Sequence, residues 1–164
     1  MDQDDPIFLR KRLESAEGYL MLGMDEEAWA ELEDLSVDDL PTRDDKASYL
    51  SLVLELALRS SDWDLGARIA EALVIVKPAH IPAYVHGAYC LHELGQTDKA
   101  RALLIGGPPD LREEPLYFYN LGCYHAVLGD RIQALACLNE AFQRDPKLKK
   151  TARKDPDLQG LGQF

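Results

Sequence analysis

A regular interval between turn-type residues constrains this chain more than any other feature of its sequence. Gly95 and Gly129 each follow a leucine, and Ser61 lies as far before Gly95 as Gly95 lies before Gly129. The interval of about 34 residues falls within the range of about 20–50 residues that indicates stacked copies of one structural unit. It therefore predicts three windows of equal length, which begin at Ala47, Ile81 and Pro115.

Each window has the pattern of two helices joined by a tight turn. Apolar residues recur every three or four positions in residues 47–59 and 81–94, which predicts a helix with one buried stripe. A glycine after the last leucine can adopt the left-handed conformation that ends a helix. Small residues follow five positions after the turns: Gly66, Ala100 and Ala134. Polar residues suited to capping the second helices are Asp62, Thr97, Asp98 and Asp130. We expect Trp29 and Trp63 to be core aromatics of their hairpins.

An earlier and less regular unit precedes these windows. Gly23 also follows a leucine, but the interval from Gly23 to Ser61 is longer than the later ones, so four extra residues fall between them. The acidic stretch 36–45 contains Pro41 and is expected to be the loop that holds them. We therefore predict one domain over 1–164 with units at approximately 9–42, 47–80, 81–114 and 115–148 and a C-terminal cap over 147–164. Within that cap, residues 147–154 are expected to form a polar helix that stops before Pro156.

The last window resembles one complete tetratricopeptide repeat (TPR). The resemblance rests on Tyr-Asn-Leu-Gly at 119–122, Leu-Gly-Asp at 128–130, Ala134, Leu138, Ala141 and Asp-Pro at 145–146. It extends over roughly residues 9–148, and it implies an all-α, right-handed superhelical solenoid of antiparallel helix hairpins with a C-terminal capping helix. The third unit departs from the family pattern, because Gly-Gly-Pro-Pro at 106–109 interrupts its second helix, which is expected to be short.

Charge and composition limit the partners and the compartment. The net charge is −11, and residues 1–45 hold 15 acidic and 4 basic side chains, a difference that equals the whole net charge. This charge argues against nucleic acid as a partner. The longest apolar run, residues 72–76, is too short for membrane insertion. The first ten residues contain Asp2, Asp4 and Asp5 and lack the pattern of an export signal, so a cytoplasmic location with reduced cysteines is expected.

The sequence contains no pattern typical of catalysis or of a bound cofactor. His86 and Cys90 are spaced by four and would share a helix face, but two ligands do not complete a metal site. Residues 106–107 are Gly-Gly, yet prolines follow where a phosphate-binding loop has Lys and Ser or Thr. We therefore predict no catalytic residues, no cofactor and no metal.

The TPR resemblance implies a concave groove lined by the first helix of each hairpin, where a partner's peptide or helix binds. The residues at the matching positions are Leu52, Glu55, Arg59, Val85, His86, Tyr89, His92, Glu93, Tyr119, Asn120 and Cys123, and the first unit adds Leu13 and Glu17. Family members that clamp a terminal carboxylate use lysines, an arginine and asparagines on this face. Only Asn120 matches them, so carboxylate clamping is not expected.

These patterns favour a protein–protein interaction module with an adaptor or assembly role. An alternative is a chaperone of the class II type III secretion type, which is similar in length, acidity and repeat number. A less favoured alternative is an enzyme or metal-binding protein on a TPR scaffold. A basic cluster also follows the last repeat, and its pairing with the acidic N-terminal end of a second molecule would give salt-sensitive head-to-tail association: Arg144, Lys147, Lys149, Lys150, Arg153 and Lys154.

Overall fold

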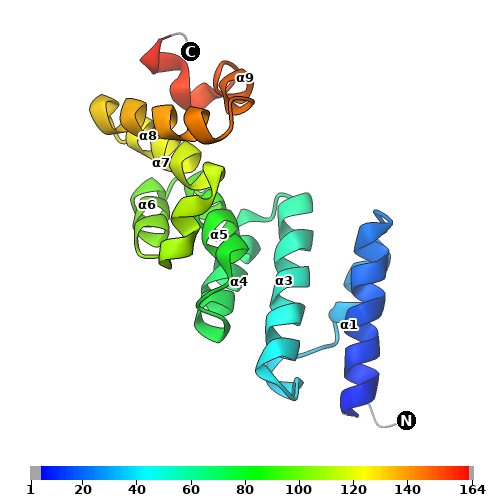
Figure 1. Ribbon diagram of the computed structural model, residues 1–164. Helices are drawn as coiled ribbons and strands as arrows, with labels where there is room; N and C mark the ends of the chain where they lie inside the picture. Colours follow the sequence, from blue (N-terminus) through cyan, green and yellow to red (C-terminus); the bar gives the residue numbers. More distant parts are fainter. Residues whose placement is uncertain (1–4, 163–164) are drawn as a thin grey trace. The chain divides into compact units, whose positions relative to one another are not determined.

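Over the residues that the structure describes, helices are the only regular secondary structure. The structure, a computed structural model, describes residues 5–162. The elements of this range are α1 (Pro6–Met21), α2 (Asp25–Leu32), η1 (Val37–Asp39), α3 (Arg43–Arg59), α4 (Trp63–Val76), α5 (Ile81–Glu93), α6 (Thr97–Ile105), η2 (Pro109–Glu113), α7 (Pro115–Val127), α8 (Arg131–Arg144), α9 (Leu148–Ala152) and η3 (Pro156–Leu161), where η denotes a 3₁₀ helix (Figure 1). The expected all-α class is confirmed.

The turns between paired helices share one backbone conformation. Gly23, Ser61, Gly95 and Gly129 all have positive φ, at 73°, 57°, 75° and 84°. At each turn, the amide after this residue donates to a carbonyl five residues before it, as Asp130 does to His125 at 2.8 Å. Ser61, which the period places at the same position as the glycines, therefore adopts a conformation that is strained for a residue with a side chain.

The helix starts confirm part of the predicted capping. Asp62 and Asp130 accept hydrogen bonds from the backbone amides of Leu65 and Gln133, each at 3.1 Å. The prediction for Thr97 and Asp98 is wrong, because the residue that precedes α6 is Gln96, whose side chain makes no capping bond. As predicted, the second helix of the repeat over 81–114 is short, since α6 ends at Ile105 before Gly106 and Gly107.

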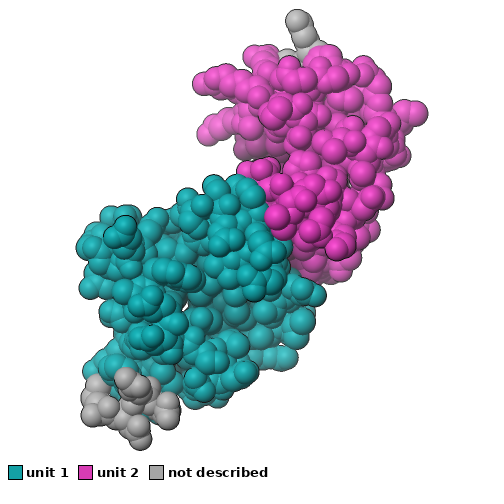
Figure 2. All heavy atoms as spheres, turned by 180° about the vertical axis from the view of Figure 1, so that it is seen from behind, with its two compact units in different colours: residues 1–83 teal, residues 84–164 magenta. Residues whose placement is uncertain are grey.

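The chain divides into two compact units, residues 1–83 and 84–164, coloured teal and magenta in Figure 2. Unit 1 contains α1 to α4, and unit 2 contains most of α5 and all later elements. The single domain over 1–164 and its repeat limits stay predictions. The acidic residues Asp2 and Asp4 lie outside the described residues.

Unit 1 is held together by two clusters of buried aliphatic side chains. The first joins α1, α2 and α3 and comprises Leu9, Leu13, Ala16, Leu20, Ala28, Leu32, Leu40, Val53 and Leu56. The second joins α3, α4 and the start of α5 and comprises Ala47, Leu50, Leu54, Ala70, Leu73 and Ala83. The expected loop 36–45 is only partly a loop, because η1 lies within it and α3 begins at Arg43.

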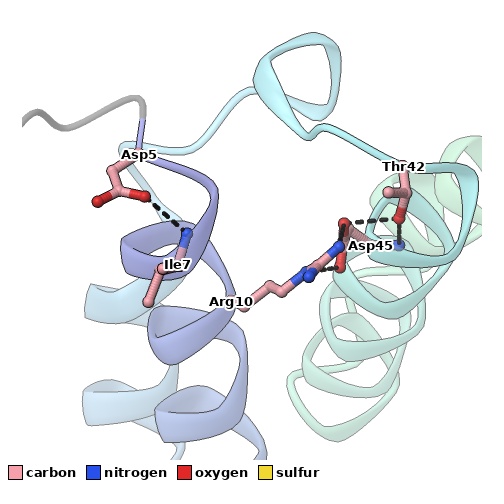
Figure 3. A network of polar contacts seen from close by, with 5 residues as sticks. All are labelled: Asp5, Ile7, Arg10, Thr42 and Asp45. Carbon is pink, nitrogen blue, oxygen red and sulfur yellow. Dashed lines mark hydrogen bonds and ion pairs between the residues drawn. The ribbon is translucent and has the colours of Figure 1, made fainter.

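A polar network fixes the start of α3 against α1 within unit 1 (Figure 3). Thr42 caps α3 by accepting from the amide of Asp45 at 3.1 Å, and its hydroxyl donates to the Asp45 carboxylate at 2.6 Å. Arg10 of α1 donates to both carboxylate oxygens of Asp45, at 2.9 and 3.1 Å. The hydrogen bond from Arg10 holds the pKa of Asp45 below its usual value.

Unit 2 packs around the close approach of α7 and α8. A Cβ added at Gly122 would lie 2.7 Å from Cγ of Leu138, so this glycine permits the contact between the two helices. Leu138 and Ala134 of α8 are fully buried. The chain then continues into α9, which is shorter than the predicted helix over 147–154, and η3 begins at Pro156.

The predicted core position of Trp29 is wrong. Its side chain is 38% exposed, and Trp63 is only half-buried. Ala28 and Leu32 form the buried stripe of α2, and Trp29 is turned about 100° away from Ala28 around the helix axis. Trp29 therefore lies at the edge of the hairpin instead of inside it.

Candidate functional site

The predicted partner-binding residues of unit 1 fall in two different places. Leu52 lines an open cavity of about 420 Å³ together with Leu13 and Glu17 of α1, and with Lys77 and His80 after α4. Arg59 instead lines a cavity of about 260 Å³ with Trp29. Arg59 donates to Asp25 at 2.7 Å and also pairs with Glu55. The structure thus brings Leu52 together with Leu13 and Glu17, while Glu55 and Arg59 belong to an ion-pair network beside α2.

In unit 2, three predicted residues of α5 line a larger cavity. Tyr89, His92 and Glu93 border a space of about 950 Å³. Its other side is formed by the chain after α8, including Lys150, Thr151, Lys154, Pro156 and Asp157. Tyr89 is 39% exposed, so its ring is available at the surface of this cavity.

The other predicted residues of unit 2 do not line this cavity. Val85 is 7% exposed and is packed within the unit, while His86 and Asn120 are half-buried. Tyr119 and Cys123 are 6% and 4% exposed. Tyr119, which the TPR resemblance places on the groove face, is therefore buried within unit 2.

The C-terminal segment, residues 155–161, covers Tyr119 and Cys123. The hydroxyl of Tyr119 donates to Asp155 at 2.7 Å, and the thiol of Cys123 donates to the same carboxylate oxygen at 3.6 Å. His92 of α5 pairs with Asp157 through Nε2 at 2.8 Å, while its Nδ1 lies 3.0 Å from the hydroxyl of Thr97. One short segment thus contacts three of the predicted partner-binding residues.

Apolar packing and hydrogen bonds to its backbone also hold residues 155–161 against unit 2. Leu158 and Leu161 are 1% and 9% exposed. Arg131, the first residue of α8, donates to the carbonyls of Gly160 and Leu161 at 3.0 and 2.9 Å. Asp155 also begins η3 by accepting from the amide of Asp157. The sequence analysis predicted a cap over 147–164, but it did not predict that residues 155–161 contact Tyr119, Cys123 and His92.

Burial changes the acidity of the side chains beneath the segment. Burial, together with the hydrogen bond to Asp155, raises the pKa of Tyr119 far above its usual value. Burial and the negative charges of Asp155 and Asp157 raise the pKa of the Cys123 thiol in the same way. Both groups therefore stay protonated and act as hydrogen-bond donors over the physiological pH range.

Within the described range, Cys123, Asp155 and Asp157 bring three potential metal-ligating atoms within 4.8 Å of one another. Each already has a hydrogen-bonding role, since Asp155 accepts from Tyr119 and Cys123 while Asp157 pairs with His92. A thiol also ligates metals as its anion, and the raised pKa opposes that form. The hydrogen bonds account for this cluster without an ion. His86 and Cys90, the pair noted from sequence, do not belong to it.

Comparisons with known proteins identify the fold. Neither a protein-family model nor a curated protein sequence matches the chain significantly. Among solved structures, the crystal structure of YrrB, described as a TPR protein with an unusual peptide-binding site, matches with a TM-score of 0.75 and 18% identity over 94% of this chain and 77% of that one. The structure of the MamA RS-1 ArsTM double mutant matches with a TM-score of 0.76 and 16% identity over 92% of this chain and 81% of that one.

Between residues 5 and 162, no helix combines the length and the apolar character needed to cross a membrane. The similarity to YrrB covers helices from both units, and the turn geometry repeats at the predicted spacing. The chain therefore has the all-α, TPR-type fold of antiparallel helix hairpins that its repeat predicts.

Proposed function

We propose that this protein is a non-enzymatic interaction module that binds a peptide or helix of a partner polypeptide, in an adaptor or assembly role and in the cytoplasm. The observation that carries the proposal is the open cavity of unit 2, where the exposed ring of Tyr89 lies beside His92 and Glu93. YrrB supports it as a protein of this fold that is described as having a peptide-binding site.

The residues around this cavity suit a peptide better than a small metabolite. The space of about 950 Å³ is open and has charged side chains of both signs, with Glu93 on α5 and Lys150 and Lys154 on the opposite side. A tyrosine gives a rigid apolar contact with a polar tip, and flanking charges fix the register of a bound chain. We infer that Tyr89 is the main anchor for the partner.

The test is an affinity pull-down from native lysate at low and high salt with a Tyr89→Ala variant. Ile132→Ala is the matched control, because Ile132 is 79% exposed on α8 and does not line this cavity. We expect a partner that the native chain and the Ile132→Ala chain retain and that the Tyr89→Ala chain loses. Equal retention by all three chains contradicts the proposed anchor. Tyr119 is unsuitable for this test, since it is buried beneath residues 155–161.

The identity of the captured protein separates the alternatives. A secreted client would favour the secretion-chaperone alternative, and a metal ion retained after purification without chelators would favour the enzyme or metal-protein alternative. The absence of nucleic acid as a partner stays a prediction from the net charge of −11.

The proposed head-to-tail association is tested separately. The basic residues Lys150 and Lys154 border the cavity of unit 2, and the net negative charge lies in residues 1–45. Association through these charges predicts an oligomer whose mass in light scattering falls as salt rises. A monomer at every ionic strength contradicts it.

A further inference from the structure

Residues 155–161 contact the predicted partner-binding face of unit 2, which comprises His92, Tyr119 and Cys123, in the way that a bound peptide would. Tyr119 and Cys123 lie four residues apart and therefore share one face of α7, and His92 comes from α5. All three point their polar atoms at carboxylates of this segment. The segment thus occupies positions that the TPR resemblance assigns to a partner.

The chemistry of these contacts exceeds what a terminal cap requires. A cap needs only to cover apolar surface at the end of a solenoid, which Leu158 and Leu161 do. Here two carboxylates also meet side-chain donors, and Arg131 binds two backbone carbonyls. Hydrogen bonds to ionised groups are shorter and stronger than those between neutral groups. The contacts to the aspartate side chains depend on the sequence of the segment, as contacts in a recognition site do, while Arg131 holds its backbone.

We infer that residues 155–161 are a built-in ligand of unit 2, and that this face accepts from a partner a short acidic peptide of the same pattern. That pattern is two aspartates two positions apart, followed directly by leucine. The inference rests on the proposed function, and it deepens it by naming the chemistry of the partner and a competitor within the chain itself.

Tethering explains how the segment would regulate binding. A segment joined to α8 through α9 has an effective concentration in the millimolar range at its site, so a free peptide with identical contacts competes poorly. A partner that also fills the adjacent cavity, beside Tyr89 and Lys154, gains contacts that the segment leaves unused. The segment therefore excludes weak ligands and yields to longer ones.

The test uses the full chain and a labelled synthetic peptide with the sequence of residues 154–162, Lys-Asp-Pro-Asp-Leu-Gln-Gly-Leu-Gly. The Asp155→Asn/Asp157→Asn double variant weakens the segment and keeps its leucines. We expect this variant to bind the peptide at least tenfold more tightly than the native chain, measured by fluorescence anisotropy. A peptide with both aspartates replaced by asparagine should bind at least tenfold more weakly to the variant.

Asp98→Asn/Asp110→Asn is the matched control, because it removes the same charge from exposed positions on α6 and η2. It should bind the peptide no better than the native chain does. If the Asp155→Asn/Asp157→Asn variant stays folded and gains no affinity over the native chain, the segment is only a structural cap and the inference is wrong.

A second measurement needs no variant. In hydrogen exchange on the native chain, a displaceable ligand opens by itself, so the amides of residues 158–161 should exchange at least tenfold faster than those in the centre of α7. Equal exchange in both places would overturn the inference. Because both tests use only this chain and its own peptide, they can fail while a partner still binds through Tyr89, or succeed when no partner is found.

Discussion

The hydroxyl of Tyr119 donates a 2.7 Å hydrogen bond to the carboxylate of Asp155, which lies 36 residues later in the chain. Both side chains come from unit 2, and the bond joins α7 to the segment that follows α9. Tyr124, on the same helix, is also buried, but its hydroxyl has no hydrogen-bond partner among the described residues. The two tyrosines therefore form a matched pair.

Replacing each tyrosine by phenylalanine should have different effects on the free energy of unfolding. Tyr119→Phe removes a hydrogen bond to a carboxylate and should lower the free energy of unfolding by about 1.5–3 kcal/mol. Tyr124→Phe removes a buried hydroxyl that lacks a partner, so its effect should be neutral or stabilising by about 1 kcal/mol. Urea unfolding followed by circular dichroism measures both. A larger loss for Tyr124→Phe than for Tyr119→Phe contradicts the hydrogen bonding described for α7.

Stability should fall in alkaline solution. The pKa values of Tyr119, Cys123 and Tyr124 are raised in the folded chain, chiefly by burial. Above about pH 8.5–10 these groups lose protons in the unfolded chain but keep them in the folded chain, so the unfolded state is favoured. The contribution is fully present below that range. Cys123→Ala should reduce the slope of unfolding free energy against pH between 8 and 10, and an unchanged slope would show that the thiol titrates normally.

Gly122→Ala should destabilise unit 2, because the new Cβ would lie 2.7 Å from Cγ of Leu138. Overpacking of a buried helix contact typically costs about 1–3 kcal/mol. Gly18→Ala is the matched control within a helix, since a Cβ there meets nothing within 4 Å. That control should stabilise α1 by up to about 1 kcal/mol. Similar melting-temperature shifts for both variants would show that α7 and α8 do not approach closely at Gly122.

Ser61→Gly should stabilise the first regular hairpin. Ser61 has φ of 57°, a region that costs a residue with a side chain about 1–2 kcal/mol. Glycine relieves this strain but also makes the unfolded chain more flexible, so the free energy of unfolding should rise by about 1 kcal/mol. The reciprocal change Gly95→Ser places serine at the equivalent turn, where φ is 75°, and should cost a similar amount. Thermal unfolding of the two variants should therefore show shifts of opposite sign.

Local patterns predicted most of the fold. The leucine-glycine pairs and their regular interval located the turns, and they placed Ser61 at the same turn position as the glycines, which its positive φ confirms. The capping prediction for Thr97 and Asp98 was wrong because it placed the helix start one or two residues too late. Asp62 and Asp130 each follow the turn residue directly. The equivalent position in the repeat over 81–114 is Gln96, whose side chain makes no capping hydrogen bond to α6.

The candidate site was less predictable, because its contacts join residues that are distant in sequence. Nothing in the repeat pattern indicates that Asp155 meets Tyr119 or that Asp157 meets His92, since both aspartates follow the last complete repeat. The leucines at 158 and 161 were the available signal, because a spacing of three residues suits one buried face of a 3₁₀ helix. Exposure of Trp29 was predictable from its angular position beside Ala28 and Leu32.

The central claim is that this protein binds a polypeptide through the cavity beside Tyr89. Its most direct test is the dissociation constant of the captured partner for the native, Tyr89→Ala and Ile132→Ala chains at one salt concentration. The account predicts that Tyr89→Ala weakens binding by about 30-fold, as for an interface residue worth about 2 kcal/mol, while Ile132→Ala leaves it unchanged. Equal dissociation constants for the native and Tyr89→Ala chains, with both folded, would contradict the account.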